Sequence, residues 1–435
     1  MSTDIQACID RRRRFIAAMR RGIAVIPTAP EAIRNGDAHY PYRYDSHFHY
    51  LTGFPEPEAV LVLIAGDSPQ SVLFCRDKDV EREIWDGYRY GADAAREQFG
   101  FDAAFSITQL DDKLVELMAN QPALFHPVGH DEKWDARLLA LRRRVQEKSR
   151  SGVTAPGEIH DARLLLDEMR LFKDASELAI MRRAADISAA AHIRAMRATR
   201  PGMMEYAIEA ELLHEFRKNG AQSPAYTSIV AGDANACVLH YIGNDKPLND
   251  GDLLLIDAAC ELNGYASDIT RTFPVNGRFS AAQKDVYQMV LAAQTAAIAA
   301  SRPGQRWNAP HEAALRVIAQ GLIDLKLCSG SVDVVLESES YKRYYMHRTG
   351  HWLGKDVHDV GAYKQDGDWR ALAPGMVFTV EPGCYIRAAE DVPRELWNIG
   401  IRIEDNVVIT AQGCEILTAA APKTVAEIEA VMQSR

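Results

Sequence analysis

Hydrophobic positions in the first third of the chain predict a buried sheet flanked by helices. The apolar run EAVLVLIAG (58–66), a short polar turn and SVLFCR (71–76) predict two neighbouring strands. Apolar spacing of about 3.6 residues predicts helices at 4–21, 79–99, 108–120 and 131–148. We therefore expect an α/β arrangement with a mostly buried sheet in this part of the chain.

The polar segment KSRSGVTAPG (148–157) interrupts this pattern and indicates a boundary near 150–175. A chain of 435 residues has room for two domains of ordinary size. We expect an N-terminal domain over 1–172 and a C-terminal domain over 173–435.

The second region alternates long amphipathic segments with short apolar ones. A long helix over 177–198 should take Asp174 or Ser176 as its N-cap. Further helices are expected at 204–220, 280–300, 309–327 and 425–433. Strands are expected at 226–231, 252–259, 265–275, 376–382, 384–387, 399–404 and 406–410. This order predicts an α+β domain with antiparallel sheet.

Composition limits the kinds of partner that the protein could bind and indicates its cellular compartment. The net charge of −10 argues against nucleic acid or an anionic membrane as the main partner, because both require a basic face. Seven scattered cysteines without a C-x-x-C pair are typical of free thiols in a reducing compartment. We find neither a signal-peptide pattern nor an apolar run of 18 residues, and therefore expect a cytoplasmic protein.

The strongest local signal is the segment GDLLLIDAACELNGYASDITRTFPV. Asn263-Gly264 between two β-rich runs is typical of a type I′ hairpin turn. In that register Asp257 lies opposite Thr270, and Asp268 is a diagonal neighbour of Asp257 on the same face. The two carboxylates then either face solvent or share a cation, because otherwise they would repel each other.

Two glutamates lie on strands that are otherwise apolar. In GMVFTVEPG, Thr379 and Glu381 share one face of a strand. In NIGIRIEDNVVI, Ile399, Ile401 and Ile403 share one face, while Arg402 and Glu404 share the other. A buried glutamate is costly unless it is paired or ligated, and for Glu404 taken alone an ion pair with Arg402 is the favoured interpretation.

The segment MHRTGHWLGKDVHDVG contains His347, His351 and His358. Four carboxylates and one imidazole suit Mn²⁺, Co²⁺, Fe²⁺ or Zn²⁺. Two such cations balance four carboxylates and leave room for a bridging hydroxide as nucleophile. Other catalytic motifs fail: His311-Glu312 is not part of H-E-x-x-H, and neither G-x-S-x-G nor a P-loop occurs.

Several segments closely resemble aminopeptidase P, the Xaa-Pro aminopeptidase of the M24 pita-bread metallopeptidases. They are IDAACELNGYASDITRTFPV, MHRTGHWLGKDVHDVG, VFTVEPGCYI and GIRIEDNVVIT. YPYRYDSHFHYLTGFPEPEAVLVL matches the N-terminal domain of that family, and EMRLFKDASELAIMRRAADISAAAH matches its domain junction. The resemblance implies a creatinase-like N-terminal domain and a C-terminal domain with the pita-bread fold.

The resemblance also implies a set of site residues. Two metal ions, usually manganese, would be held by Asp257, Asp268, His351, Glu381 and Glu404. Asp268 and Glu404 would bridge both ions, and Glu381 would also carry the proton to the leaving nitrogen. His240, His347 and His358 would be pocket histidines, with His358 on the scissile carbonyl. Tyr385 and Arg402 would support the ligands, while Trp85, and with a shorter match Asp37, would come from the N-terminal domain of the same or a neighbouring subunit.

The implied activity is removal of the first residue from peptides with proline in second position, by a homo-oligomer, either a dimer or a tetramer. Prolidase, an Xaa-Pro dipeptidase, shares fold and ligands and is the nearest alternative. Methionine aminopeptidase lacks an N-terminal domain of this size. Creatinases and non-catalytic pita-bread binding modules lack the metals, whereas all five ligand positions are filled here.

Overall fold

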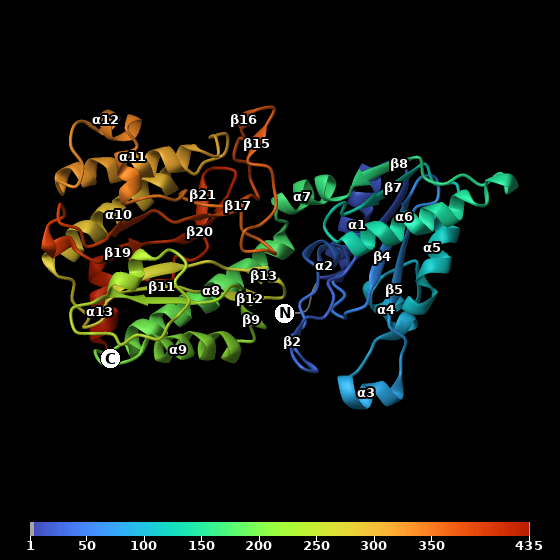
Figure 1. The fold of residues 1–435 in the computed structure, drawn as a ribbon, viewed down its shortest axis with the longest axis horizontal. Helices are drawn as coiled ribbons and strands as arrows, with labels where there is room; N and C mark the ends of the chain where they lie inside the picture. The colour runs from blue at the N-terminus through green and yellow to red at the C-terminus, as the bar shows by residue number, and fades with distance from the viewer. Residues whose placement is uncertain (1–3, 435) are drawn as a thin grey trace. The chain divides into compact units, whose positions relative to one another are not determined.

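The computed structural model describes residues 4–434. The chain divides into two compact units, one ending at Arg170 and the other starting at Leu171. Figure 1 shows the N-terminal unit in blue to blue-green and the C-terminal unit in green to red. Within the described residues, we find no helix with the length and apolar character that crossing a bilayer requires.

The N-terminal unit is built on one mixed sheet of six strands, in the order β6-β5-β4-β1-β7-β8. Its strands are β1 (Gly22–Pro27), β4 (Val60–Ala65), β5 (Gln70–Cys75), β6 (Ala103–Ser106), β7 (Ala123–His126) and β8 (Glu158–Asp161), with β2 (Ile33–Asn35) and β3 (Ala38–His39) forming a separate pair. Its helices are α1 (Ile5–Met19), α2 (Ser46–Thr52), α3 (Val80–Asp86), α4 (Gly91–Phe99), α5 (Leu110–Met118), α6 (Glu132–Gln146) and α7 (Arg163–Leu171). The expected hairpin is confirmed, because β4 and β5 pair antiparallel.

Helices cover both faces of this sheet. Ile23 and Val25 of β1 belong to a core that includes Leu114 of α5. Ala24 and Ile26, which alternate with them, belong to the core that includes Phe15 of α1. Since successive strand residues point to opposite faces, both kinds of position are apolar. This explains why these strands read as continuous apolar runs.

The single helix expected over 79–99 is wrong. The structure has two helices there, because α3 ends at Asp86 and α4 begins at Gly91. Gly87, which follows the last residue of α3, and Gly91, the first residue of α4, have φ angles of 87° and 70°, so the backbone leaves the right-handed helical region at both. The segment therefore turns between them.

The C-terminal unit combines long helices with small antiparallel sheets, as expected. The helices are α8 (Ala175–Ala198), α9 (Glu205–Lys218), α10 (Ala281–Ala300), α11 (Ala309–Asp324), α12 (Val332–Glu337) and α13 (Val425–Gln433). The strands are β9 (Ser223–Pro224), β10 (Ile229–Gly232), β11 (Leu253–Asp257), β12 (Cys260–Leu262), β13 (Tyr265–Ala266), β14 (Thr270–Pro274), β15 (Lys364–Gln365), β16 (Asp368–Trp369), β17 (Val377–Val380), β18 (Gly383–Ile386), β19 (Ile399–Arg402), β20 (Asp405–Ile409) and β21 (Cys414–Ile416). The N-cap of α8 is Asp174, which forms a capping box with Glu177.

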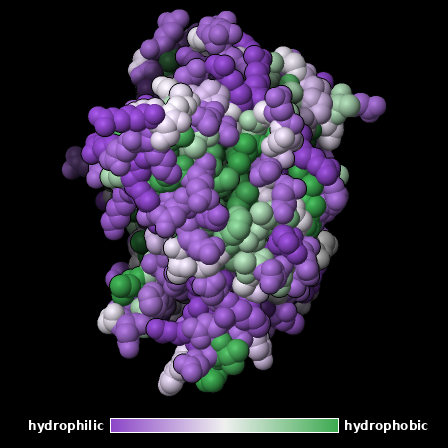
Figure 2. Space-filling view, turned by 90° about the vertical axis from the view of Figure 1, so that its right-hand side faces the viewer, coloured by the Kyte–Doolittle hydropathy of each residue, from purple (hydrophilic) through white to green (hydrophobic). Residues whose placement is uncertain are grey.

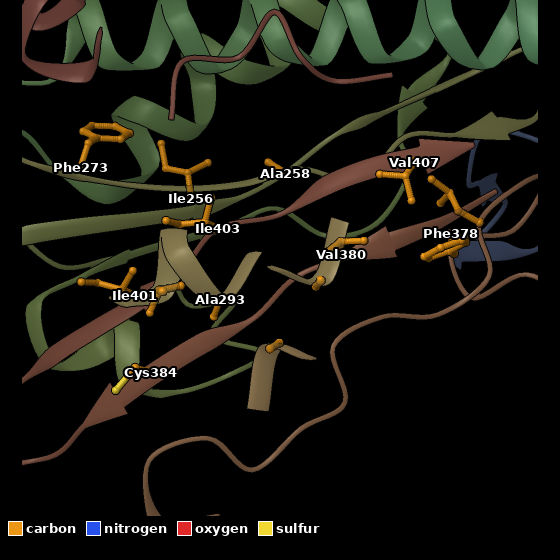
Figure 3. Packing of buried hydrophobic residues seen from close by; sticks show 14 of the residues in the cluster. Ile256, Ala258, Phe273, Ala293, Phe378, Val380, Cys384, Ile401, Ile403 and Val407 are labelled. Atoms are coloured by element: carbon orange, nitrogen blue, oxygen red, sulfur yellow. The ribbon is translucent and has the colours of Figure 1, made fainter. Parts of the chain in front are cut away.

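The isoleucines of the 399–404 segment pack into the core as their alternation predicts. Ile399, Ile401 and Ile403 are all buried in one hydrophobic cluster. Figure 3 shows Ile401 and Ile403 close to Ile256 of β11 and Ala293 of α10. The opposite face of the segment, which carries Arg402 and Glu404, is thereby turned toward the polar site described next.

Candidate metal centre

The β11–β14 ladder places Asp257 as the hairpin register predicts. The turn residues Asn263 and Gly264 have φ angles of 50° and 71°, as a type I′ turn requires. Asp257 at the end of β11 pairs with Thr270. The strand expected over 265–275 is, however, broken between β13 and β14, and Asp268 lies in this break.

A tyrosine joins the two aspartates. The hydroxyl of Tyr226 lies 2.6 Å from Oδ1 of Asp257 and 2.6 Å from Oδ1 of Asp268. The second oxygen of Asp257 accepts a 2.6 Å hydrogen bond from Arg402. The aspartates therefore share one polar environment, and the ion pair of Arg402 is with Asp257 and not with Glu404.

Glu381 and Glu404 lie next to the ends of strands, close to the aspartates. Glu381 comes after β17, and its Oε1 accepts a 3.1 Å hydrogen bond from the hydroxyl of Thr379. Glu404 lies between β19 and β20, and its Oε2 accepts a 2.7 Å hydrogen bond from Thr270. In both contacts the side-chain hydroxyl of a threonine on a strand fixes the carboxylate.

The segment containing His351 lies alongside β17. The Thr379 amide donates to the His351 carbonyl at 3.0 Å, and the Glu381 amide donates to the Thr349 carbonyl at 2.8 Å. A Cβ on Gly350 would lie 2.0 Å from the carbonyl oxygen of Thr379, so only glycine allows this approach. The backbone pairing brings His351 to the level of Glu381.

The imidazole of His351 faces the carboxylates with Nε2. Its Nδ1 lies 3.0 Å from the carbonyl oxygen of Trp352, which fixes the ring with Nε2 directed into the site. Nε2 is 3.4 Å from Oδ2 of Asp268 and 3.5 Å from Oε1 of Glu381. Burial opposes protonation of His351, but the hydrogen bond and charges of these carboxylates outweigh it and raise its pKa to about 9.

The carboxylates themselves resist ionisation in this arrangement. Burial raises the pKa of Glu381 to about 7, and the charge of Asp268 adds to that effect. Burial and neighbouring carboxylates raise the pKa of Glu404 well above its ordinary value. Asp268, His351 and Glu404 each offer one ligand atom, and these atoms lie within 4.8 Å of one another. This donor set suits a divalent cation, which would remove the repulsion.

The expected pocket residues line one cavity of about 920 Å³ around these ligands. Nε2 of His347 forms a 2.8 Å hydrogen bond with the hydroxyl of Tyr385. The same hydroxyl accepts a 3.0 Å hydrogen bond from Arg402. The ring of His358 lies edge-on to His351 with 4.3 Å between centroids. His240 is also on the cavity wall.

Two expected residues lie in the other unit. Trp85 is on α3 with 83% of its surface exposed, and Asp37 is exposed between β2 and β3. Sequence reasoning missed Tyr226, because one tyrosine in the run SPAYTSIV carries no signal that distinguishes it from a core aromatic residue. Only the fold shows that its hydroxyl meets both aspartates.

Comparisons with known proteins agree with this geometry. Residues 179–411 match the model of metallopeptidase family M24, and residues 8–125 match that of the aminopeptidase P N-terminal domain. The Xaa-Pro aminopeptidase of Escherichia coli is 45% identical over 97% of this chain and 96% of its own length. The structure of the Pseudomonas aeruginosa aminopeptidase PepP is 51% identical and superposes with a TM-score of 0.98, covering 100% of this chain and 99% of that one.

A further solved structure bears on the chemistry of the site. It is zinc-substituted E. coli aminopeptidase P in complex with product, which is 44% identical with a TM-score of 0.97 over 100% of this chain and 99% of that one. The family matches cover both units, and the relatives match nearly the full length. The chain therefore belongs to metallopeptidase family M24, as an aminopeptidase P with the pita-bread fold in its C-terminal unit.

Proposed function

We propose that this protein removes the N-terminal residue from peptides whose second residue is proline, using two divalent metal ions. One observation carries the proposal: five potential ligands from separate segments converge in one cavity, where buried carboxylates have raised pKa values. The named activity of the 45% identical E. coli relative supplies the peptide class.

We assign the ligands by position and chemistry. Asp257 would hold one ion, His351 and Glu381 the other, and Asp268 and Glu404 would bridge them. Oxygen donors and a single imidazole suit Mn²⁺, which we propose as the ion in the cell. Bound there, the ions would activate water as a nucleophile at neutral pH and would polarise the peptide carbonyl.

Protein side chains do the remaining work. His358, beside His351 on the cavity wall, would donate a hydrogen bond to the scissile carbonyl oxygen as negative charge develops on it. Glu381 would carry a proton to the leaving proline nitrogen. His347 and His240 would contact the substrate, and the Tyr385–Arg402 hydrogen bond would orient the guanidinium against Asp257.

Domain limits and assembly form part of the same proposal. We assign 1–172 to the N-terminal domain and 173–435 to the catalytic domain, supported by the division between Arg170 and Leu171. Val80, Ile84 and Trp85 are 71%, 79% and 83% exposed, which supports burial against a second copy in a dimer or tetramer. Figure 2 shows a central band and several smaller patches of hydrophobic side chains on a face that is mostly hydrophilic. Trp85 would meet substrate from such a neighbouring subunit or from the same one.

The state of the cysteines bears on the cellular compartment of the protein. All seven are free, and five of them are buried. Free thiols in this number suit a reducing environment, so we propose a cytoplasmic location.

A peptide panel with mass detection tests the activity. With Mn²⁺ added, we expect Xaa-Pro-Yaa tripeptides and longer peptides to lose only residue one. Xaa-Ala-Yaa controls should be cut poorly, because the substrate class is defined by proline in second position. A strong preference for Xaa-Pro dipeptides, with longer peptides untouched, would assign the chain to prolidase instead.

A further inference from the structure

Two cationic side chains on the cavity wall lack a carboxylate partner. Arg348 and Lys364 both line the cavity that holds the site. Neither side chain has a carboxylate oxygen of a described residue within 4.0 Å, the limit for an ion pair. Both residues are exposed. Arg402, the other cation of this cavity, is in contrast 2.6 Å from Asp257.

Both cations lie against the same indole ring. The guanidinium carbon of Arg348 lies 4.9 Å from the ring centroid of Trp369, and Nζ of Lys364 lies 4.8 Å from it. Lys364 of β15 and Trp369 of β16 are directly paired in a short hairpin (Figure 1). Arg348 also donates to Oδ1 of Asn308, which leaves most of its donors available. We call Arg348, Lys364 and Trp369 the Trp369 cluster.

The cavity is therefore electrically polarised. Carboxylates gather at the metal centre, whereas the Trp369 cluster brings unpaired positive charge to the same wall. His347 lies between the metal centre and the Trp369 cluster. Its Nδ1 is 3.9 Å from Oε2 of Glu381, and the next residue in the chain is Arg348. A short peptide has the matching polarity, with a positive amine at one end and a carboxylate at the other.

We infer that the Trp369 cluster binds a substrate carboxylate located beyond the proline. This rests on the proposed function, because it places residue one and its amine at the metal centre. The carboxylate is either the C-terminus of a short peptide or the side chain of Asp or Glu at the same distance. Arginine binds carboxylates through paired N–H donors, and Lys364 adds a second charge. The cluster makes short or acidic peptides the preferred substrates.

The test compares matched peptides on the full-length enzyme with Mn²⁺. One arm uses Xaa-Pro-Yaa peptides of three to six residues with a free C-terminal carboxylate or a C-terminal amide. The other uses amidated peptides of one length that carry Glu or Gln at successive positions after proline. The enzymes are the wild type, Arg348→Gln, Lys364→Gln and Lys284→Gln, a control at an exposed lysine on α10.

We expect kcat/KM of the wild type to favour the acid over the amide about three- to tenfold at one peptide length, carried mainly by KM. Arg348→Gln and Lys364→Gln should bring this ratio toward one, whereas Lys284→Gln should keep it. A preference for Glu over Gln at that position would identify side-chain carboxylates as the second source.

Equal rates for acid and amide at every length, together with equal rates for Glu and Gln, would overturn the inference. So would a preference that survives in both cluster variants or is lost equally in Lys284→Gln. Failure of the proposed function has a different signature, since no Xaa-Pro peptide of either kind would then be cut.

Discussion

His358 presents its imidazole to the cavity beside a proposed metal ligand. Burial and the charge of His351 lower its pKa, so the ring is neutral at physiological pH. We expect His358→Ala to reduce kcat by about 10²–10³, the usual cost of losing one donor to a developing oxyanion. Metal content should stay the same, because His358 is not assigned as a ligand.

Turnover with an Xaa-Pro-Yaa peptide and bound Mn²⁺, measured on one sample, check this prediction. His214→Ala, at an exposed histidine of α9, is the matched control. Unchanged turnover in His358→Ala would assign this histidine to structure alone.

The bridging assignment makes Asp268 and Glu404 more critical than Asp257. Loss of a bridging carboxylate affects both ions, whereas Asp257→Glu keeps a carboxylate on one ion. We expect Asp268→Ala and Glu404→Ala to lose far more activity than Asp257→Glu and to bind fewer than two ions per chain. Metal analysis beside kinetics measures this, and two bound ions in Glu404→Ala would argue against bridging.

Among single residues, the sequence identifies the acids and histidines of the site more readily than the residues that hold them in place. Asp257, Asp268 and Glu381 stand out because a carboxylate in an apolar strand needs a partner. Tyr226 does not stand out, although its hydroxyl touches both aspartates. Its role depends on a contact across more than thirty residues, which no local pattern records.

A buried ion pair ties β14 to β20 directly behind the metal centre. Arg271 and Asp405 are fully buried and 2.8 Å apart, and Arg271 also donates to the carbonyl oxygen of Glu404. Lys423, before α13, contacts the other oxygen of Asp405 at 2.6 Å. The pair thus fixes the backbone on which Glu404 is carried.

Removing one member should destabilise the fold strongly. We expect Arg271→Met to cost about 3–5 kcal/mol in the free energy of unfolding, because Asp405 loses a buried partner. For a unit of this size the melting temperature should fall by about 6–20 °C. Arg182→Met, at the exposed pair of Arg182 with Glu415, should cost less than about 1 kcal/mol. Equal losses in the two variants, by calorimetry, would refute this account of the buried pair.

Element types followed from apolar periodicity, whereas some element limits did not. The β4–β5 pair and the Asn263-Gly264 turn were predictable because turn chemistry and alternation agree. The helix expected over 79–99 failed because its periodicity continues through Gly87 and Gly91, whose positive φ angles break it. The break at Asp268 depends on contacts across the sheet: Asn406 Oδ1 accepts from its backbone amide at 3.0 Å.

For the whole molecule, chain length and the hydrophobic pattern predicted two units, but they could not predict what each unit does. The C-terminal unit contains every proposed metal ligand and the whole cavity wall. The N-terminal unit contributes a separate sheet and the exposed hydrophobic residues of α3. The role in assembly that we propose for these residues requires a second copy, and one sequence carries no signal for the placement of that copy.

The requirement for metal tests the central claim most directly. The purified protein is treated with a chelator, dialysed and assayed with an Xaa-Pro-Yaa peptide before and after addition of Mn²⁺. We expect release of residue one to stop on chelation and to return with Mn²⁺, because clustered carboxylates at this centre need divalent cations to be stable and active. Full activity in a preparation shown by elemental analysis to be free of metal would contradict the account.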